Sequence, residues 1–400
     1  MRSARTGLLI VSLAALGALA CDEGSALSGE PDAATTSDTS DTGDTGAATA
    51  PDVTPDITID VAIDAPAPDI AFDPSRIAVG PNACCLTMNG ERAIWSEDGD
   101  LWMIDLANGR RAPLVIAAGV QKDPVLEGDR LVWADSRGGD FDLWTLTFDD
   151  DGAAGSAALL RGGPGDQDEP ALSGARLVWI GRDAAPHTAL EAEVWTLELG
   201  AGAHARSERR LTFDAAEQTQ PDVDGDTIVW ADFTLSPAAR YLPENDPLKN
   251  NADILGIDLA TDEALEITRD LSKQLRPAID GDVVAWLDWR GINPEPKYSE
   301  FQVYVRRFGE LVERRLAWSS WDRPELWRRP AVSQGVVVFI AEPTAGTPFV
   351  TSVLAVSADG GEPWLVAGSP SVLDSVVVDG GHAAWIGGGT LGVKALTLGP

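Results

Sequence analysis

From about residue 76 to the carboxyl end, short apolar runs alternate with turns rich in Gly and Asp. One such stretch, "DPVLEGDRLVWADSRGGDFDLW", returns in shortened form as "EPALSGARLVW", "QPDVDGDTIVW" and "RPAIDGDVVAW". Short runs rich in Val, Ile, Leu and Trp, bounded by turn residues, are typical of β-strands and not of helices. The pattern therefore predicts an all-β body that is built from one repeated unit.

The repeated unit keeps a fixed spacing between an apolar residue, a Pro, a Gly and a Trp. The Pro stands ten positions after the apolar residue, the Gly four after the Pro, and the Trp five after the Gly. Four copies keep all three intervals: Leu114–Pro124–Gly128–Trp133, Leu160–Pro170–Gly174–Trp179, Leu211–Pro221–Gly225–Trp230 and Ile267–Pro277–Gly281–Trp286. Weaker copies extend the array to seven: Gly90–Trp95, Pro330–Gln334–Phe339 and Gly380–Trp385. A spacing repeated in this way indicates a structural module and not an active site.

Each unit predicts four strands. The first runs from the Pro to the Gly turn, the second ends at the Trp, the third is a following run such as "LWTLTF" or "ILGIDL", and the fourth precedes the next Pro. Pro suits the first position of a strand because no N–H donor is needed there. Four strands in each repeat of 38 to 56 residues predict a β-propeller with seven four-stranded antiparallel blades.

The seventh copy ends after its third strand, which would leave an unpaired edge in the ring. The apolar run "RIAV", Arg76 to Val79, precedes the first copy and is free to supply the missing strand. We therefore expect the last blade to be closed by an N-terminal strand.

These repeats resemble those of TolB-like and related WD40-like propellers of bacterial exported proteins. The resemblance rests on "EGDRLVWADSRGGDFDLWTLTF" and "DGDTIVWADF…ADILGIDLATDEALEITRD" and covers residues 76–400. It implies a protein-binding or scaffolding role, because TolB is a periplasmic partner of a peptidoglycan-associated lipoprotein. This chain departs from TolB in having no separate amino-terminal TolB domain and in carrying its own candidate anchor.

The first twenty residues predict an export signal. Arg2 and Arg5 precede an apolar run that ends in "ALAC", and the run is too short to span a bilayer. Cys21 after small residues resembles the lipobox of bacterial lipoproteins, although Ala18 stands where that family prefers Leu. The resemblance implies a lipid on Cys21; an ordinary cleaved signal is the alternative. We expect a lipid-anchored exported protein and favour the outer membrane, on its periplasmic or surface-facing side, over the inner membrane.

Residues 21–75 predict a flexible tether between the anchor and the repeats. From Asp22 to Pro74 there are thirteen acidic residues and no Lys or Arg. Low hydrophobicity with charge of one sign does not offset the entropy lost on ordering. A coil of this length reaches about 40 Å on average. The sequence therefore predicts three parts: residues 1–20, 21–75 and 76–400.

The formal net charge of −33 argues against nucleic acid as a partner, because the chain would repel phosphate. Cys84 and Cys85 are adjacent, and two readings stay open: a pair of small buried residues or a strained disulfide. No ligand set for a metal is evident, and we expect no cofactor and a monomeric chain.

Of the fourteen Trp residues, nine stand at repeat positions and are expected in the core: Trp95, Trp133, Trp179, Trp230, Trp286, Trp385, Trp102, Trp144 and Trp195. Three others crowd with five arginines into "RRLAWSSWDRPELWRRP", Arg314 to Pro330. In a propeller this connection shares a face with the long loops at 233–253 and 289–301. Basic and aromatic side chains on such loops suit recognition of a partner. The predicted binding residues are Trp321, Trp327, Arg323, Arg328, Tyr241 and Tyr298. Alternatively, the rings pack the loop onto the propeller and the arginines pair with nearby acids.

A Gln three residues before the Pro recurs in four copies: Gln121, Gln167, Gln218 and Gln274. These amides are candidates for the mouth of the central channel, or for caps on backbone groups where the strand begins.

Catalytic signals are weak. The three His residues lie in loops and a turn, and no GxSxG, HExxH or phosphate-loop motif occurs. Asp135 with Arg137, and Asp288 with Arg290, are read as a turn-stabilising ion pair because they repeat. We therefore expect a membrane-tethered, non-enzymatic propeller that binds a protein or glycan of the cell envelope. The alternatives are a polysaccharide lyase or hydrolase, and a structural surface protein without a discrete ligand.

Overall fold

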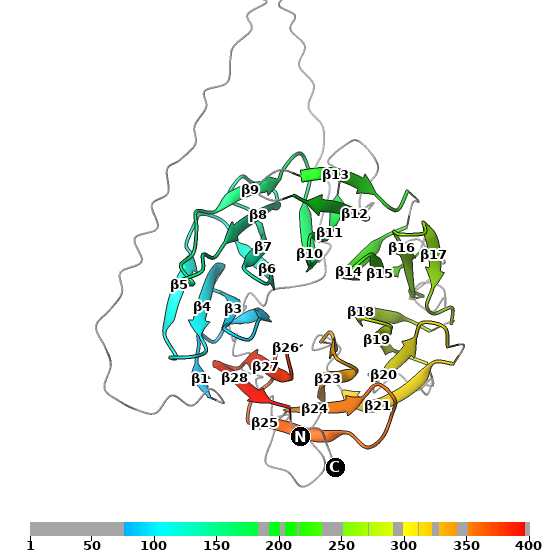
Figure 1. The fold of residues 1–400 in the computed structure, drawn as a ribbon. Helices are drawn as coiled ribbons and strands as arrows, with labels where there is room; N and C mark the ends of the chain where they lie inside the picture. The colour runs from blue at the N-terminus through cyan, green and yellow to red at the C-terminus, as the bar shows by residue number, and fades with distance from the viewer. Residues whose placement is uncertain are drawn as a thin grey trace, which may run out of the picture. The chain divides into compact units, whose positions relative to one another are not determined.

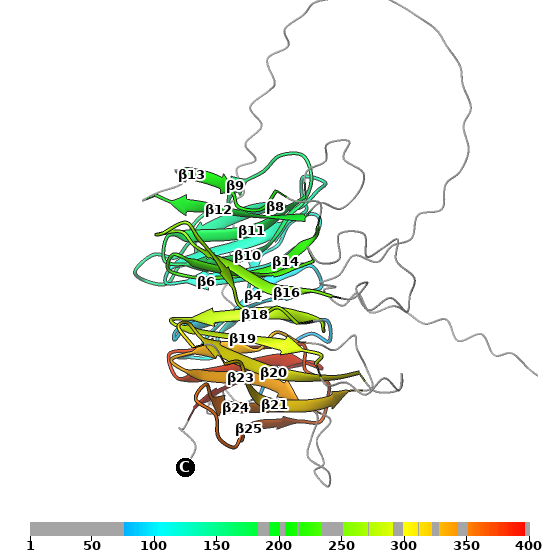
Figure 2. The same ribbon diagram turned by 90° about the vertical axis from the view of Figure 1, so that its right-hand side faces the viewer.

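The computed structural model describes residues 76–182, 192–200, 205–213, 216–233, 251–270, 272–290, 299–310, 312–321, 328–341 and 351–396. These residues form seven four-stranded antiparallel sheets arranged around a central axis (Figure 1). The ring is seen from its side in Figure 2, where the strands run between its two faces. The predicted seven-bladed β-propeller is confirmed.

The first four blades follow one another along the chain, and in each the strands run in chain order from the centre outward (Figure 1). Their strands are β2 (Cys84–Met88), β3 (Arg92–Glu97), β4 (Asp100–Asp105) and β5 (Arg111–Val115) in blade 1; β6 (Gln121–Glu127), β7 (Arg130–Asp135), β8 (Asp142–Thr147) and β9 (Ala158–Arg161) in blade 2; β10 (Gln167–Ser173), β11 (Arg176–Arg182), β12 (Ala192–Leu199) and β13 (Ala205–Arg210) in blade 3; and β14 (Gln218–Asp224), β15 (Thr227–Asp232), β16 (Asp253–Asp258) and β17 (Glu263–Glu266) in blade 4.

The last three blades complete the ring. Their strands are β18 (Gln274–Asp280), β19 (Val283–Asp288), β20 (Ser299–Arg307) and β21 (Arg314–Trp321) in blade 5; β22 (Ala331–Ser333), β23 (Val336–Ala341), β24 (Thr351–Ser357) and β25 (Trp364–Ser369) in blade 6; and β26 (Ser375–Asp379), β27 (His382–Gly387), β28 (Thr390–Ala395) and β1 (Ile77–Ala78) in blade 7.

Blade 7 joins the two ends of the repeat array. In β1, Ile77 lies opposite Leu391 and Ala78 opposite Thr390, both in β28. The amide of Val79 extends the pairing by donating a hydrogen bond to the carbonyl of Gly389 at 3.1 Å. The predicted closure by an N-terminal strand is confirmed, and the pairing is only two residues long.

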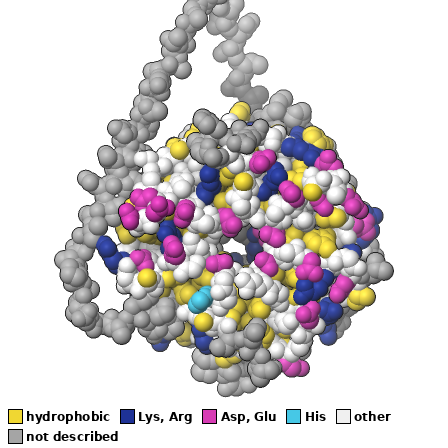
Figure 3. Space-filling model, viewed as in Figure 1, with side chains coloured by type: hydrophobic (Ala, Val, Ile, Leu, Met, Phe, Trp, Pro, Cys, Tyr) yellow, Lys and Arg dark blue, Asp and Glu magenta, His cyan; other side chains and the backbone are white. Residues whose placement is uncertain are grey.

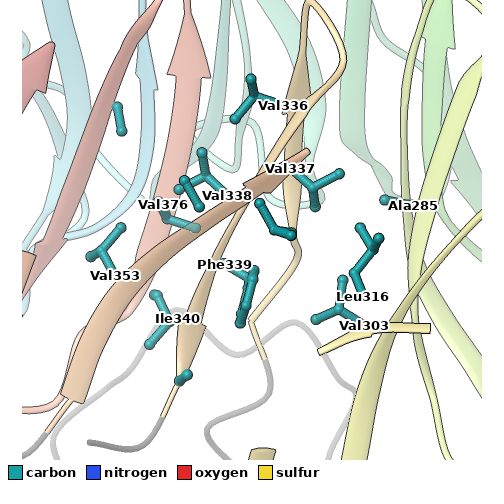
Figure 4. Close-up of a cluster of buried hydrophobic side chains, with 14 of the residues drawn as sticks. Ala285, Val303, Leu316, Val336, Val337, Val338, Phe339, Ile340, Val353 and Val376 are labelled. Atoms are coloured by element: carbon teal, nitrogen blue, oxygen red, sulfur yellow. The ribbon is translucent and has the colours of Figure 1, made fainter. Parts of the chain in front are cut away.

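The core lies between neighbouring blades, where each sheet packs on the next. In Figure 4, the side chains of β23 in blade 6 extend toward Val303 and Leu316 on one side and Val353 and Val376 on the other. The six Trp residues on the second strands are at most 6% exposed, as predicted for core residues: Trp95, Trp133, Trp179, Trp230, Trp286 and Trp385.

The three Trp residues on the third strands are partly buried and pack against the core clusters: Trp102, Trp144 and Trp195. The outer side of two of these rings is covered by arginine instead of by apolar side chains. The Arg111 guanidinium lies 4.4 Å from the Trp102 ring centre, and that of Arg137 lies 3.9 Å from the Trp144 ring centre. Such stacked cations remain partly hydrated, so the rings beneath them keep some exposure.

A carboxylate two residues after the Trp holds its indole N–H in four blades. The Nε1–oxygen distance is 2.9 Å for Trp95–Glu97 and Trp133–Asp135, and 3.0 Å for Trp230–Asp232 and Trp286–Asp288. The ion pairs predicted from the sequence are present: Arg137 lies 2.6 Å from Asp135, and Arg290 lies 2.6 Å from Asp288. Asp135 and Asp288 thus each satisfy a buried donor and are themselves neutralised.

Candidate functional site

Most of the residues predicted to bind a partner lie outside the described part of the chain: Trp327, Arg323, Tyr241 and Tyr298. Trp321 is the last residue of β21, and its side chain is likewise not described. Arg328 is described and stands two residues before Pro330, next to the innermost strand of blade 6. Cys21, the predicted lipid attachment site, also lies outside the described residues.

The four repeated glutamines begin the innermost strands of blades 2 to 5 and are buried. The amide nitrogen of Gln121 donates to the Ala118 carbonyl at 3.1 Å, that of Gln167 to Gly165 at 2.8 Å, and that of Gln274 to Ser272 at 2.6 Å. Gln218 starts the equivalent strand in blade 4. In three blades the amide therefore holds the incoming loop against the start of the strand.

The next two residues differ in chemistry from blade to blade. They stand two and one positions before the strand Pro, or before Leu86 and Val376, which take its place in blades 1 and 7. We call these fourteen residues the inner ring. From blade 1 to blade 7 they are Cys84 and Cys85, Lys122 and Asp123, Asp168 and Glu169, Thr219 and Gln220, Leu275 and Arg276, Arg328 and Arg329, and Asp374 and Ser375.

A β-bulge shapes the inner ring in five blades. The residue just before the Pro or its equivalent has a φ between 51° and 57°: Cys85, Asp123, Glu169, Gln220 and Arg276. The register with the second strand shifts at the same place in each of these blades. A left-handed backbone is unfavourable for residues such as Glu, Gln and Arg, and a bulge re-aims the side chain it carries.

Side chains of the inner ring reach from one blade to the next. The Gln220 amide N–H donates to Glu169 Oε2 at 2.5 Å, and the Arg276 amide N–H donates to Gln220 Oε1 at 2.8 Å. In each case the bulged residue of one blade accepts from the bulged residue of the following blade. The side chains of Glu169 and Gln220 therefore link blades 3, 4 and 5 in series.

In blade 1 the inner ring carries the two cysteines. Cys84 is buried and Cys85 is partly buried, and their sulfur atoms lie 3.1 Å apart. A covalent S–S bond is about 2.05 Å long, so the relation between these two sulfurs is a non-covalent contact.

Blades 2 and 3 contribute an acidic arc to the ring, made of Asp123, Asp168 and Glu169 with Lys122, and Arg182 at the end of β11 lies beside it. Lys122 lies 3.3 Å from Asp123 and 3.4 Å from Asp168, and Arg182 bonds Asp168 and lies 3.4 Å from Glu169. Burial alone would lower the pKa of Lys122, but the three carboxylates around it raise that pKa above its ordinary value. Both cations therefore stay charged, and three carboxylates face two cations.

Blades 5 and 6 contribute an arginine arc, made of Arg276, Arg328 and Arg329. Arg328 pairs with Asp374 of blade 7 at 2.7 Å, and burial raises the pKa of that carboxyl although Arg328 opposes the shift. Arg329 donates to the carbonyls of Gln220 and Pro221 at 2.9 and 2.8 Å. These carbonyls belong to blade 4, two blades away, so the Arg329 side chain spans the inner side of blade 5.

Asp222 of blade 4 lies within the influence of the Arg329 charge. The Asp222 side chain is partly buried. This burial raises the pKa of its carboxyl, although the charge of Arg329 opposes the shift. Its carboxylate also accepts the Ile279 amide at 2.9 Å. Among the described residues, Arg329 thus acts on Asp222 and Arg328 pairs with Asp374. The described ring residues are mostly arginines in blades 5 and 6 and mostly carboxylates in blades 2 and 3.

The opposite end of the channel repeats one hydrogen bond and varies little. The last residue of an innermost strand accepts from the turn of the next blade: Glu127 from Gly174 at 3.3 Å, Ser173 from Gly225 at 3.0 Å, Asp224 from Gly281 at 2.8 Å and Asp280 from Gln334 at 2.8 Å. Figure 3 shows one face of the ring, hollowed at its centre, with Asp and Glu side chains around the opening. Because these turn bonds repeat from blade to blade, we assign them to holding neighbouring blades together.

The described residues contain no group of three His, Cys, Asp or Glu side chains placed to hold a metal ion. Nor does any helix among them have the length and apolar character needed to cross a membrane. What the inner ring offers chemically is a set of fixed charges at one end of a channel, suited to orienting a charged ligand.

No family model and no curated protein matches this sequence. Solved structures do match. An acylaminoacyl peptidase of Pyrococcus horikoshii is 12% identical, with 79% of this chain and 52% of that chain covered and a TM-score of 0.51. TolB of Acinetobacter baumannii is 13% identical (70% and 65% covered, TM-score 0.45), and a putative TolB of Agrobacterium tumefaciens is 15% identical (59% and 81%, TM-score 0.42).

At these identities the likeness concerns the fold alone. The chain spans about half of the peptidase, so that enzyme's activity does not transfer with the fold. The class is that of a seven-bladed β-propeller, and the ring described above is its form in this chain.

Proposed function

We propose that this chain is an exported, lipid-anchored propeller that binds a protein or glycan partner of the cell envelope without catalysis. Its binding surface would be the loop face, by which we mean the face where the innermost strands begin. The anchor on Cys21, the tether over residues 21–75 and the outer-membrane location belong to the same proposal. They rest on the sequence alone.

One observation carries the proposal: the charge of the inner-ring residues varies from blade to blade, while the strands that hold them stay the same. The repeats preserve the Pro, Gly and Trp, while the two residues before the Pro change from cysteines to acids to arginines. Five of these positions also keep an unfavourable backbone conformation. The surrounding fold maintains this backbone strain at residues that differ in charge. Such a combination is typical of a recognition site.

The opposite face, where the innermost strands end in turns, differs from the loop face, and we call it the turn face. Its bonds repeat from blade to blade, and their donors are backbone amides of the neighbouring blade. These turn residues keep one role in the four blades named above, whereas the inner-ring residues change from cysteines to acids to arginines. Ligands also favour loops on a rigid scaffold, and the longest connections of this chain leave from the loop face.

The test is capture from detergent-solubilised cell envelope by the tagged full-length protein. We expect wild type to retain a partner, Arg276→Glu to lose it, and Arg130→Glu to retain it, because Arg130 begins β7 next to the turn face. Retention of the partner by all three proteins would show that the partner does not bind at the loop face. Capture of nothing by wild type would favour a structural surface protein, and release of a cleaved glycan would favour the enzymatic alternative.

A further inference from the structure

One lysine of the loop face has an amine that makes no hydrogen bond among the described residues. We propose that Lys273 is a covalent attachment site for an aldehyde, which its amine binds as an imine while the Glu217 carboxylate moves the protons. Such a site goes beyond the proposed function, because it concerns the reactivity of one side chain and does not depend on the envelope partner. A reversible imine is a form of binding and needs no catalytic turnover.

A backbone hydrogen bond that recurs in four blades fixes the position of Lys273. The residue before each repeated Gln accepts, at its carbonyl, the amide N–H of the residue at or just after the end of the second strand. From blade 2 to blade 5 the pairs are Val120 with Ser136, Asp166 with Arg182, Glu217 with Phe233, and Lys273 with Trp289, at 2.8 to 3.1 Å. The bond uses only the backbone, so the side chain at this position is left to other tasks.

The Lys273 amine lies beside an aromatic ring and near a carboxylate with which it does not pair. Its Nζ is 5.6 Å from the centre of the Phe233 ring, and the Phe233 amide is bonded to Glu217 as described above. The negative charge of Glu217 acts on the amine. Among the described residues, however, neither the Lys273 amine nor the Glu217 carboxylate has an ion pair or a hydrogen bond.

The other described lysines differ from Lys273 in this respect. Lys122 pairs with Asp123 and Asp168, and Lys394 donates to the Val366 carbonyl at 2.7 Å. Both amines are therefore held by an acceptor as ammonium groups. Lys273 is only partly buried, so a small molecule can reach its nitrogen.

The surroundings of Lys273 favour its reactive form. Burial lowers the pKa of the amine, and the charge of Arg276 also lowers this pKa, although Glu217 opposes the shift. Only the neutral amine has a lone pair for attack on a carbonyl carbon. Desolvation, and a second cation nearby, are recurring means of activating a lysine as a nucleophile.

Imine formation at Lys273 requires proton transfers and no oxidant or reductant. The Nζ lone pair bonds the carbonyl carbon, and Glu217 passes one N–H proton to the carbonyl oxygen, which gives a carbinolamine. The second N–H proton follows the same path to the hydroxyl group. This group leaves as water while nitrogen and carbon form the C=N bond. The two N–H protons and the carbonyl oxygen thus depart as one water molecule.

The test incubates the full-length protein with glycolaldehyde and cyanoborohydride at pH 7 and maps the reduced adducts by peptide mass spectrometry. The chain has five lysines, so each adduct can be assigned: Lys122, Lys249, Lys273, Lys297 and Lys394. We expect Lys273 to react about tenfold faster than the other four, and Lys273→Arg to abolish the fast labelling. Equal labelling of all five lysines would overturn the inference.

A second probe identifies the source of the aldehyde, because the open form of a reducing glycan end carries the same group. N,N′-diacetylchitobiose replaces glycolaldehyde, and labelling of Lys273 is expressed relative to that of Lys394. A larger ratio with the disaccharide assigns the site to glycan ends, and a larger ratio with glycolaldehyde assigns it to small aldehydes. Both results support an aldehyde site at Lys273.

The pH dependence separates reactivity from simple accessibility. The ratio of Lys273 to Lys394 labelling should fall as pH rises from 7 to 10, because an ordinary lysine then also becomes neutral. A ratio that stays constant would mean that Lys273 is merely easier to reach, which contradicts the inference.

Glu217→Gln tests the proton transfers. Because Glu217 raises the pKa of Lys273, the variant should begin to label at lower pH than wild type. At pH 10 its labelling should be several-fold slower, since the carboxylate that moves the protons is missing. Lys394→Arg is the matched control and should leave labelling of Lys273 unchanged. An unchanged rate for Glu217→Gln at pH 10 would remove Glu217 from the reaction.

Discussion

At the scale of single residues, the fold depends on buried charges that occur in matched sets. Asp135 is fully buried and receives the Trp133 indole N–H together with two nitrogens of Arg137. Removing one member leaves the others without a partner in a region of low dielectric, and the cost exceeds that of losing a surface ion pair.

Asp135→Ala should therefore lower the free energy of unfolding by about 3–5 kcal/mol, because both a buried indole N–H and a guanidinium lose their acceptor. Trp133→Phe keeps most of the packing and leaves Asp135 bound to Arg137, so its cost should be smaller. Denaturant unfolding followed by fluorescence of the remaining Trp residues compares the two. Equal costs would show that packing, and not the ion set, dominates here.

Asp222 gives a prediction on pH. Burial raises its folded-state pKa above the ordinary 3.8, so the folded chain binds this proton more tightly than the unfolded chain. Its contribution to stability is therefore present at low pH and is lost as pH rises from 3.8 through the folded-state pKa. Asp222→Asn keeps an acceptor for Ile279 and should flatten this part of the stability–pH curve. An unchanged slope would mean that Arg329 fully offsets the burial of Asp222.

At the scale of elements, the innermost strands hold some residues in a backbone conformation that is unfavourable for their residue type. Arg276 sits at φ 57° in a bulge that the sequence does not favour. The bulge persists because the Arg276 amide donates to Gln220 and the strand continues into the packed core through Ile279. Local strain is thus held by tertiary contacts.

Arg276→Gly should be more stable than Arg276→Ala by about 1 kcal/mol, because only Gly adopts this backbone without a steric penalty. Both variants lose the guanidinium and should bind a partner equally poorly. Thermal unfolding of the two proteins gives the comparison. If Ala is as stable as Gly, the bulge is not strained and the argument from strain to recognition fails.

The latch between β1 and β28 gives a second prediction at this scale. Ile77 packs with Leu391 and Trp95, whereas its neighbour Arg76 is exposed. Ile77→Ala should cost about 2 kcal/mol of unfolding free energy, because this residue supplies the buried side chain of the closing strand. Arg76→Ala should change it by less than about 0.5 kcal/mol. Similar midpoints for Ile77→Ala and wild type would mean that the ring does not depend on this closure.

At the scale of the whole molecule, the repeats made the architecture predictable. The Pro, Gly and Trp positions gave the strand count, the blade count and the closing strand, because each performs the same task in every blade. The inner ring was not predictable in this way, since its residues differ between copies. Glu169, Gln220 and Arg276 carry no local signal for a left-handed backbone, and the reach of Arg329 to blade 4 depends on the curvature of the closed ring.

The six residues predicted to bind came from loop length and composition, and among them the described structure includes the side chain of Arg328 alone. It lies in the inner ring and pairs with Asp374. A signal that sequence reasoning had available was the charge variation directly before a constant Pro. In a repeat protein, constant positions report the scaffold, and varying charged positions next to them are the better candidates for recognition.

In-cell photocrosslinking tests the central claim most directly. A photoreactive amino acid is placed in the full-length protein at Gln220, in the inner ring, or at Arg130, near the turn face, and adducts are compared after illumination. The account predicts a discrete partner adduct from Gln220 and none from Arg130. An adduct from Arg130 without one from Gln220 would contradict it.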